Sequence, residues 1–365
     1  MASLVLLLIL LVAAMSLPAA HCDGGNVGFE LKLTHLLRRA VARSKARVAA
    51  LQAVAAAADP VAAARVLPTP YFDAKRSATY RALPYRSPRC GQLYYPACFQ
   101  KVCVYQYYYG DTASTAGVLA NETFTFGAGN STRVRVPNVS FGWGSINAGD
   151  LANSSGMVGF GRGPLSLVSQ LGPSRFSYCL TSYLSPTPSR LYFGAFANLN
   201  STNTSSSSGS PAQSTPFVVN PALPSMYFLS LRGISLGARR LPVDPLAFAI
   251  NDDGTGGVVI DSGTSITWLQ QDAYEAGRAP RAAWPPPPNV TVTVPDFVFH
   301  FDGANMTLPP ENYMLIASTT GYLCLAMVPS GVGTIIGNYQ QQNLHILYDL
   351  ANSLLSFLPA PCDII

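Results

Sequence analysis

Apolar residues along this chain follow two patterns, and the change between them falls near residue 67. Residues 28–57 carry leucines and a phenylalanine at helical spacing among alanines and basic residues, which predicts a basic amphipathic helix. From residue 67 onward the apolar runs are short and separated by turn residues, which is typical of β-strands. The expected strands include Val102–Tyr107, Val118–Phe126, Val134–Phe141 and Arg190–Phe193. The pattern therefore predicts an all-β body after a basic helix.

The β-rich part divides into two halves that join near residue 210. Asn198–Ser210 is rich in serine, threonine and asparagine, which predicts a surface loop. A second strand-rich region runs from Ser214 to Phe357, interrupted by Pro285–Pro288, which cannot lie inside a sheet. A chain of 365 residues is long enough for two lobes. We expect an N-terminal lobe at residues 67–212 and a C-terminal lobe at residues 213–365.

The first 66 residues read as segments that precede the β body. Leu4–Ala14 is almost continuously apolar but too short to span a bilayer, and small residues follow, so residues 1–22 are predicted to be a secretory signal peptide. Residues 23–66 hold seven Lys/Arg against three Asp/Glu. We interpret this segment as a propeptide laid across an acidic cleft. The alternative is a solvated helix or a disordered basic tail.

The composition of the chain limits the kinds of partner that we expect it to bind. The net charge of +5 arises mostly from that basic segment, so we expect no nucleic-acid partner. No later stretch is long and apolar enough to cross a membrane. Seven cysteines and eight Asn-x-Ser/Thr sequons suggest a disulfide-bonded, secreted glycoprotein. The four histidines are scattered without ligand spacing, so we expect neither a metal nor another cofactor.

One short motif carries recognisable chemistry. Asp261-Ser262-Gly263-Thr264 follows the apolar run Gly257–Ile260, so a buried strand delivers a carboxylate to a tight glycine turn. Such a carboxylate suits the activation of a water, a reaction in which two carboxylates share one proton. The alternative is an Asx-turn that merely caps the end of a strand.

Several segments resemble the pepsin-like aspartic peptidases, and in detail the plant nepenthesin-type branch. The segments are Tyr107–Ala120, Gly156–Leu167, Phe176–Leu180, Ile335–Asn343 and Pro361–Cys362, and the resemblance covers most of residues 68–365. It implies a bilobal pepsin-like fold and a monomeric aspartic endopeptidase that takes a protein or peptide between its lobes. It also implies the secretory pathway, ending outside the cell or in the vacuole.

The resemblance assigns roles to individual residues. Asp261 is one of two catalytic aspartates, Ser262 bonds backbone beneath the site, and Thr264 orients the outer carboxylate oxygen across the turn made by Gly263. Tyr109, followed by Gly110, is the tyrosine of a mobile flap that closes over substrate. For Tyr109, ordinary packing on a strand remains the alternative.

The chain also departs from this family pattern. A second Asp-Thr/Ser-Gly is not found in the 365 residues. In the family the first such motif precedes a segment like Pro68–Asp73, but here the alanine-rich stretch runs straight into it, and a second gap follows Ala276. We therefore expect a truncated N-terminal lobe and impaired or absent peptidase activity. The alternative function is a non-catalytic pseudoprotease or a secreted protein-binding inhibitor.

Cysteine pairing follows from the resemblance alone. It implies a Cys90–Cys98 and a Cys179–Cys362 disulfide. Tyr85 and Trp143 occupy positions where the family has cysteines. Cys103 and Cys324 are accordingly expected to lack partners.

Overall fold

The computed structural model describes residues 76–109, 113–126, 134–148, 156–199, 211–277, 293–316 and 323–364. The predicted signal peptide, the basic segment 23–66, most of the Asn198–Ser210 loop and the proline run lie outside these residues. The described residues form two compact units, which divide between residues 172 and 173. We call them unit 1 and unit 2 and treat each by itself.

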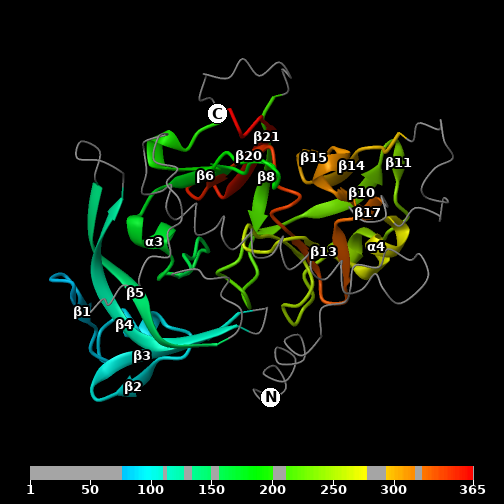
Figure 1. The fold of residues 1–365 in the computed structure, drawn as a ribbon. Helices are drawn as coiled ribbons and strands as arrows, with labels where there is room; N and C mark the ends of the chain where they lie inside the picture. The colour runs from blue at the N-terminus through cyan, green and yellow to red at the C-terminus, as the bar shows by residue number, and fades with distance from the viewer. Residues whose placement is uncertain are drawn as a thin grey trace, which may run out of the picture. The chain divides into compact units, whose positions relative to one another are not determined.

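Unit 1 is built on one antiparallel sheet. Its strand order is β1-β4-β3-β2, and β5 also pairs with β4 (Figure 1). The strands are β1 (Arg81–Ala82), β2 (Ala97–Phe99), β3 (Val102–Tyr108), β4 (Ser114–Phe126) and β5 (Val134–Ala148). A short 3-10 helix, η2 (Cys90–Gln92), and the helix α3 (Leu167–Leu171) complete it.

The strands expected in this region are present: β3 is one residue longer than predicted, and β4 and β5 are extended by several residues. β4 begins four residues before Val118, and β5 continues past Phe141 to Ala148. The added residues pair with one another, so each extension supports the other. Small residues permit the close approach: a Cβ on Gly117 would lie 1.9 Å from the Trp143 carbonyl oxygen. Small and polar residues give no alternating apolar signal, which is why the sequence pattern stopped short.

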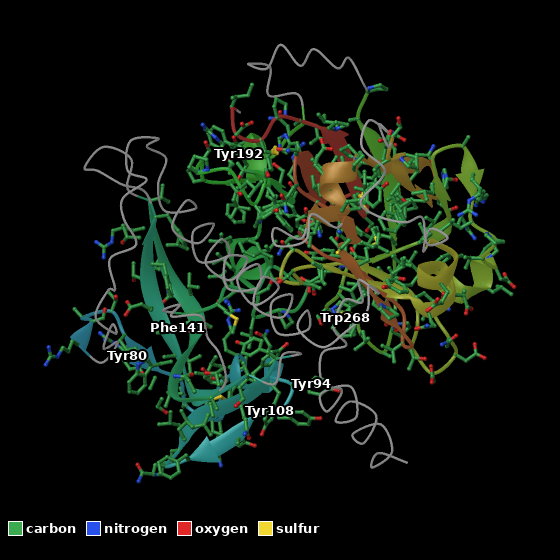
Figure 2. The ribbon with its side chains drawn as sticks, turned by 45° about the vertical axis from the view of Figure 1, so that its right-hand side comes forward. Tyr80, Tyr94, Tyr108, Phe141, Tyr192 and Trp268 are labelled. Atoms are coloured by element: carbon green, nitrogen blue, oxygen red, sulfur yellow. A yellow bond between two sulfur atoms is a disulfide. The ribbon has the colours of Figure 1, made fainter. Side chains whose placement is uncertain are left out.

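The buried core of unit 1 includes the disulfide-bonded pair Cys90 and Cys103, which packs with Leu119, and half-buried aromatic rings pack on the same sheet. Tyr80 packs edge-on against Phe141, with ring centroids 6.4 Å apart (Figure 2). Its ring also packs edge-on against Trp143, at 6.3 Å. Helix α3 docks on β5 through Gln170, which donates to the Ser140 carbonyl oxygen at 2.9 Å and accepts from its N–H at 2.7 Å.

Unit 2 contains three sheets. The largest has the order β18-β13-β19-β12-β9-β8-β21-β20-β6-β7, the second has the order β11-β10-β14-β15, and β16 pairs with β17 (Figure 1). Its strands are β6 (Arg175–Cys179), β7 (Arg190–Phe193), β8 (Gln213–Val218), β9 (Phe228–Leu229), β10 (Leu231–Leu236), β11 (Arg239–Arg240), β12 (Val258–Ile260), β13 (Thr267–Gln270), β14 (Phe297–Phe301), β15 (Ala304–Leu308), β16 (Met314–Ile316), β17 (Leu323–Leu325), β18 (Met327–Ser330), β19 (Thr334–Ile336), β20 (Leu344–Asp349) and β21 (Leu354–Pro359). Its helical segments are η3 (Gly194–Phe196), η4 (Pro245–Phe248), α4 (Gln271–Gly277) and η5 (Pro310–Asn312).

Strand pairing in the large sheet explains why unit 2 begins before residue 213. β6 pairs with β20 over five residues, so strands that precede residue 213 belong to the same sheet as the C-terminal strands. The division between the compact units therefore does not coincide with the lobe boundary expected at residues 212/213. Phe176 on β6 stacks on Tyr348 of β20 with centroids 4.5 Å apart, and both rings are buried.

Candidate active site

A short buried strand delivers Asp261 to the site. All three residues of β12 are buried, because β12 runs between β9 and the parallel strand β19. Asp261 follows directly, and its N–H donates to the Ile336 carbonyl oxygen at 3.0 Å. The strand pairing therefore fixes the backbone from which the half-buried carboxylate projects.

The glycine turn holds both oxygens of this carboxylate. Oδ1 of Asp261 accepts from the Gly263 N–H at 2.8 Å, and Oδ2 accepts from the Thr264 hydroxyl at 2.7 Å. A Cβ on residue 263 would lie 3.1 Å from Oδ1, so the glycine leaves room for the carboxylate. Two charge-assisted bonds from one turn set the orientation of the group.

A second loop crosses this turn after β19. The Asn338 N–H donates to the Thr264 carbonyl oxygen at 2.7 Å, and the Asn338 side chain donates to the Ser262 carbonyl oxygen at 3.0 Å. A Cβ on Gly337 would lie 2.5 Å from the Ile266 carbonyl carbon, so the crossing requires glycine. The Ile335–Asn343 segment and the Asp261 turn, which the sequence indicates separately, thus form one site.

A buried glutamine lies beneath the turn, and the sequence reasoning missed it. Gln340 is fully buried. Its Oε1 accepts from both the N–H and the hydroxyl of Thr267, at 2.9 and 2.8 Å. Its Nε2 donates to the carbonyl oxygens of Asn312 at 3.2 Å and Ala326 at 3.0 Å. Three consecutive glutamines in an apolar context, Gln340–Gln342, were the available signal.

Two buried tyrosines adjoin the carboxylate, and they too were missed as site residues. The hydroxyls of Tyr178 and Tyr348 lie 3.0 Å apart, and Tyr178 donates to Oε1 of Gln341. Burial raises the pKa of both hydroxyls well above the usual value, and the negative charge of Asp261 adds to the rise. Hydrogen bonding between the Tyr178 and Tyr348 hydroxyls opposes the rise in the pKa of Tyr178. Both tyrosines therefore remain neutral donors.

The predicted flap residues fall in unit 1. Tyr109 follows β3, and its N–H donates to the Ala113 carbonyl oxygen at 2.8 Å, so the β3–β4 pairing continues to this residue. Its ring lies 4.9 Å from that of Tyr107, centroid to centroid. Gly110 lies outside the described residues.

The disulfides correct part of the expected pairing. Cys179 and Cys362 are bonded, as the resemblance implies, and this bond ties the C-terminal segment to β6. Cys90 bonds to Cys103, whereas Cys98 is free and exposed, so the Cys90–Cys98 pairing was wrong. Cys103 gains the bond because β3 brings it to the fully buried position of Cys90. Cys324 is disulfide-bonded as well, so its expected isolation was also wrong.

Neither a metal cluster nor a membrane span emerges from the described residues. No three His, Cys, Asp or Glu side chains among them gather in a way that could hold a metal ion. None of the helices in the described ranges is both long and apolar enough to cross a bilayer.

Comparisons with known proteins define the family. A model described as Xylanase inhibitor N-terminal matches residues 57–195, and one described as Xylanase inhibitor C-terminal matches residues 226–280 and 281–359. The aspartic proteinase nepenthesin-1 of Nepenthes gracilis is 41% identical over 315 residues, which are 80% of this chain and 69% of that protein. Aspartyl protease family protein 2 of Arabidopsis thaliana is 37% identical, over 80% of this chain and 62% of that protein.

Solved structures share the fold. The crystal structure of Basic 7S globulin from soybean matches with a TM-score of 0.60 and 21% identity, over 78% of this chain and 82% of that one. The crystal structure described as edgp matches with the same TM-score and 19% identity, over 78% and 83%. The chain belongs to the pepsin-like aspartic protease family, and the nepenthesin-like resemblance is confirmed at about 40% identity.

Proposed function

We propose that this chain retains one catalytic half-site of an aspartic endopeptidase and that its hydrolysis of peptide bonds is impaired or absent. The observation that carries the proposal is the single Asp-Ser-Gly-Thr motif, with both oxygens of Asp261 held by its own turn. In this role Thr264 orients the carboxylate, Ser262 and Gly263 support it, and Tyr109 with Gly110 covers a bound peptide.

The chemistry explains why one half-site is insufficient. An aspartic peptidase needs one ionised carboxylate to activate water and one protonated carboxylate to donate to the carbonyl oxygen. General acid–base assistance contributes about 10²–10⁴-fold to a rate. A lone Asp261 supplies only one of the two proton-transfer groups.

Membership of this family also suggests how the chain is divided into segments. We propose a signal peptide at residues 1–22, a propeptide-like basic segment at 23–66, a truncated N-terminal lobe at 67–212 and a C-terminal lobe at 213–365. This order suits a monomer that enters the secretory pathway and ends outside the cell or in the vacuole. The disulfides support an oxidising compartment.

A non-catalytic binding function is the second candidate. Both family models that match the chain carry the description of a xylanase inhibitor. A pepsin-like body with an incomplete catalytic pair could bind a secreted glycan-degrading enzyme without cleaving it. We therefore include inhibition of a xylanase as a separate measurement.

The decisive assay measures cleavage of a denatured protein by the full chain at about pH 3–4, with and without pepstatin, a mimic of the transition state. The variants are Asp261→Asn and, as the matched control, Asp252→Asn, which changes an exposed aspartate nine residues upstream. We expect no pepstatin-sensitive cleavage by any of the three proteins. Pepstatin-sensitive cleavage that Asp261→Asn abolishes and Asp252→Asn preserves would overturn the proposal. Inhibition of a purified xylanase would support the second candidate, and unchanged xylanase activity would count against it.

A further inference from the structure

The described part of unit 1 contains three neighbouring cysteines, and a single disulfide cannot use all of them. Cys90 in η2 and Cys103 in β3 form the bond, and both are fully buried. Cys98 in β2 is a free, exposed thiol. It lies directly opposite Cys103 in the β2–β3 hairpin. The Cys98 thiol, a potential nucleophile, therefore lies next to the Cys90–Cys103 disulfide.

The strand geometry brings Cys98 and Cys103 within bonding range. The Cys103 N–H donates to the Leu83 carbonyl oxygen at 2.8 Å, and the Leu83 N–H donates to Leu119 of β4, on the side of β3 away from β2. Cys98 and Cys103 are accordingly a non-hydrogen-bonded pair, whose Cα atoms lie about 4.5 Å apart with side chains on the same face. A disulfide spans Cα distances of about 4.4–6.8 Å.

A tight turn fixes this register. Gln100 and Lys101 both have positive φ, 48° and 70°, as in the type I′ turn that closes a two-residue hairpin. The turn places Phe99 opposite Val102 and therefore Cys98 opposite Cys103. A slip by one residue would turn Cys98 to the other face of the sheet.

We propose that Cys98 exchanges with the Cys90–Cys103 disulfide, so that unit 1 exists as two disulfide isomers. The Cys98 thiolate attacks Sγ of Cys103, the Cys98–Cys103 bond forms, and Cys90 leaves as a thiolate that takes up a proton from water. One thiol and one disulfide are present before and after the step. The exchange therefore needs neither an oxidant nor a reductant.

The exchange changes which element is tied to β3. The Cys90–Cys103 bond joins residues 13 apart and ties η2 to β3, whereas a Cys98–Cys103 bond would join residues five apart (103 − 98) within one hairpin. Cys90 and Cys103 pack with Leu119 in a buried cluster, so the Cys90–Cys103 isomer is the major form. In the minor form η2 is no longer tied to β3 by a disulfide, while the segment after η2 still leads into β2, which pairs with β3.

The experiment follows the thiols of the full chain. The oxidised protein is incubated at pH 8 or pH 4, quenched with N-ethylmaleimide at timed intervals and digested without reduction by trypsin and chymotrypsin. Cleavage after Tyr94 by chymotrypsin and after Lys101 by trypsin separates the three cysteines for mass spectrometry. We expect maleimide on Cys98 at the start, then maleimide on Cys90 together with Cys98–Cys103-linked peptides at pH 8. The appearance of Cys90 should be at least about 100-fold slower at pH 4, because the thiolate is the nucleophile.

Two variants and a dilution series make the test specific. Cys98→Ser should abolish maleimide labelling of Cys90, and Cys90→Ser should contain the Cys98–Cys103 bond. The rate should not change when the protein is diluted tenfold, because the exchange is intramolecular. The proposal is overturned if Cys90 of the unmodified chain stays unlabelled after a day at pH 8, if Cys98→Ser still exposes Cys90, or if the rate falls on dilution. The time course on the unmodified chain decides the matter even if Cys90→Ser does not fold.

Discussion

Replacing Gln340 with leucine should destabilise unit 2 strongly, although the two side chains have similar volumes. Gln340 is fully buried and makes four hydrogen bonds: two from Thr267 and two to the carbonyl oxygens of Asn312 and Ala326. A leucine at this position would leave these buried donors and acceptors without a hydrogen-bond partner. A buried polar group that loses its partner costs about 1–3 kcal/mol. Because the leucine side chain is itself favourable in a core, we expect a net loss of about 3–5 kcal/mol.

A loss of that size is a large share of the margin of about 5–15 kcal/mol that holds a domain folded. Urea unfolding of the oxidised chain, followed by tryptophan fluorescence, measures it; Trp268 follows Thr267 directly and reports on this region. Gln271→Leu is the matched control, because Gln271 is exposed and its side chain donates to Glu275 on the surface of α4. We expect the control to stay within about 0.5 kcal/mol of the unmodified protein. If Gln340→Leu also stays within 1 kcal/mol, then the bonds of Gln340 do not support the site.

Three further predictions follow from buried positions in unit 2. Burial lowers the pKa of His345 to about 4. Between about pH 6.5 and pH 4 the imidazole is therefore protonated in the unfolded chain but neutral in the folded one. The free energy of unfolding should fall by up to about 3 kcal/mol as the pH drops through this range. Urea midpoints across this range test it, and His345→Asn should flatten the dependence. Gly337→Ala should lower the melting temperature, measured calorimetrically, because the new Cβ would meet the Ile266 backbone at 2.5 Å; an unchanged thermogram would contradict this. The double variant Cys179→Ser/Cys362→Ser should lose about 5 kcal/mol, since the bond closes a separation of 183 residues, and a urea midpoint equal to that of the parent would refute it.

Local pattern predicted much of the strand content. The predicted strand Arg190–Phe193 is β7, and the predicted strand Val102–Tyr107 is β3, which continues for one more residue to Tyr108. The longer extents of β4 and β5 were not predicted, because Gly117, Gly142 and Gly144 interrupt the apolar pattern, and the close approach of the two backbones depends on Gly117 having no Cβ. The Asp261 turn was also predicted: an apolar strand followed by Asp, Ser, Gly and Thr already contains the donors that the carboxylate accepts.

The residues that support this turn could not be predicted in the same way. Gln340 reaches Thr267 across 73 residues of chain, and Tyr178 reaches Tyr348 across 170. Such contacts depend on which strands become neighbours in the sheet, and periodicity along the chain carries no information about that. The pairing implied by the resemblance was wrong at Cys90, because Cys98 and Cys103 face each other in the β2–β3 hairpin and the packing of η2 decides which of them Cys90 bonds.

By itself, the sequence determined the elements and the chemistry that a few consecutive residues can make: the strands, the tight turns and one aspartate cradled by its own glycine turn. These features arise from backbone preferences and from hydrogen bonds between residues two or three apart. The tertiary structure alone decided that buried glutamines and tyrosines support Asp261 and that Cys103 bonds to Cys90 and leaves Cys98 free. Burial, hydrogen-bond partners and disulfide choice depend on distances that only the packed strands define.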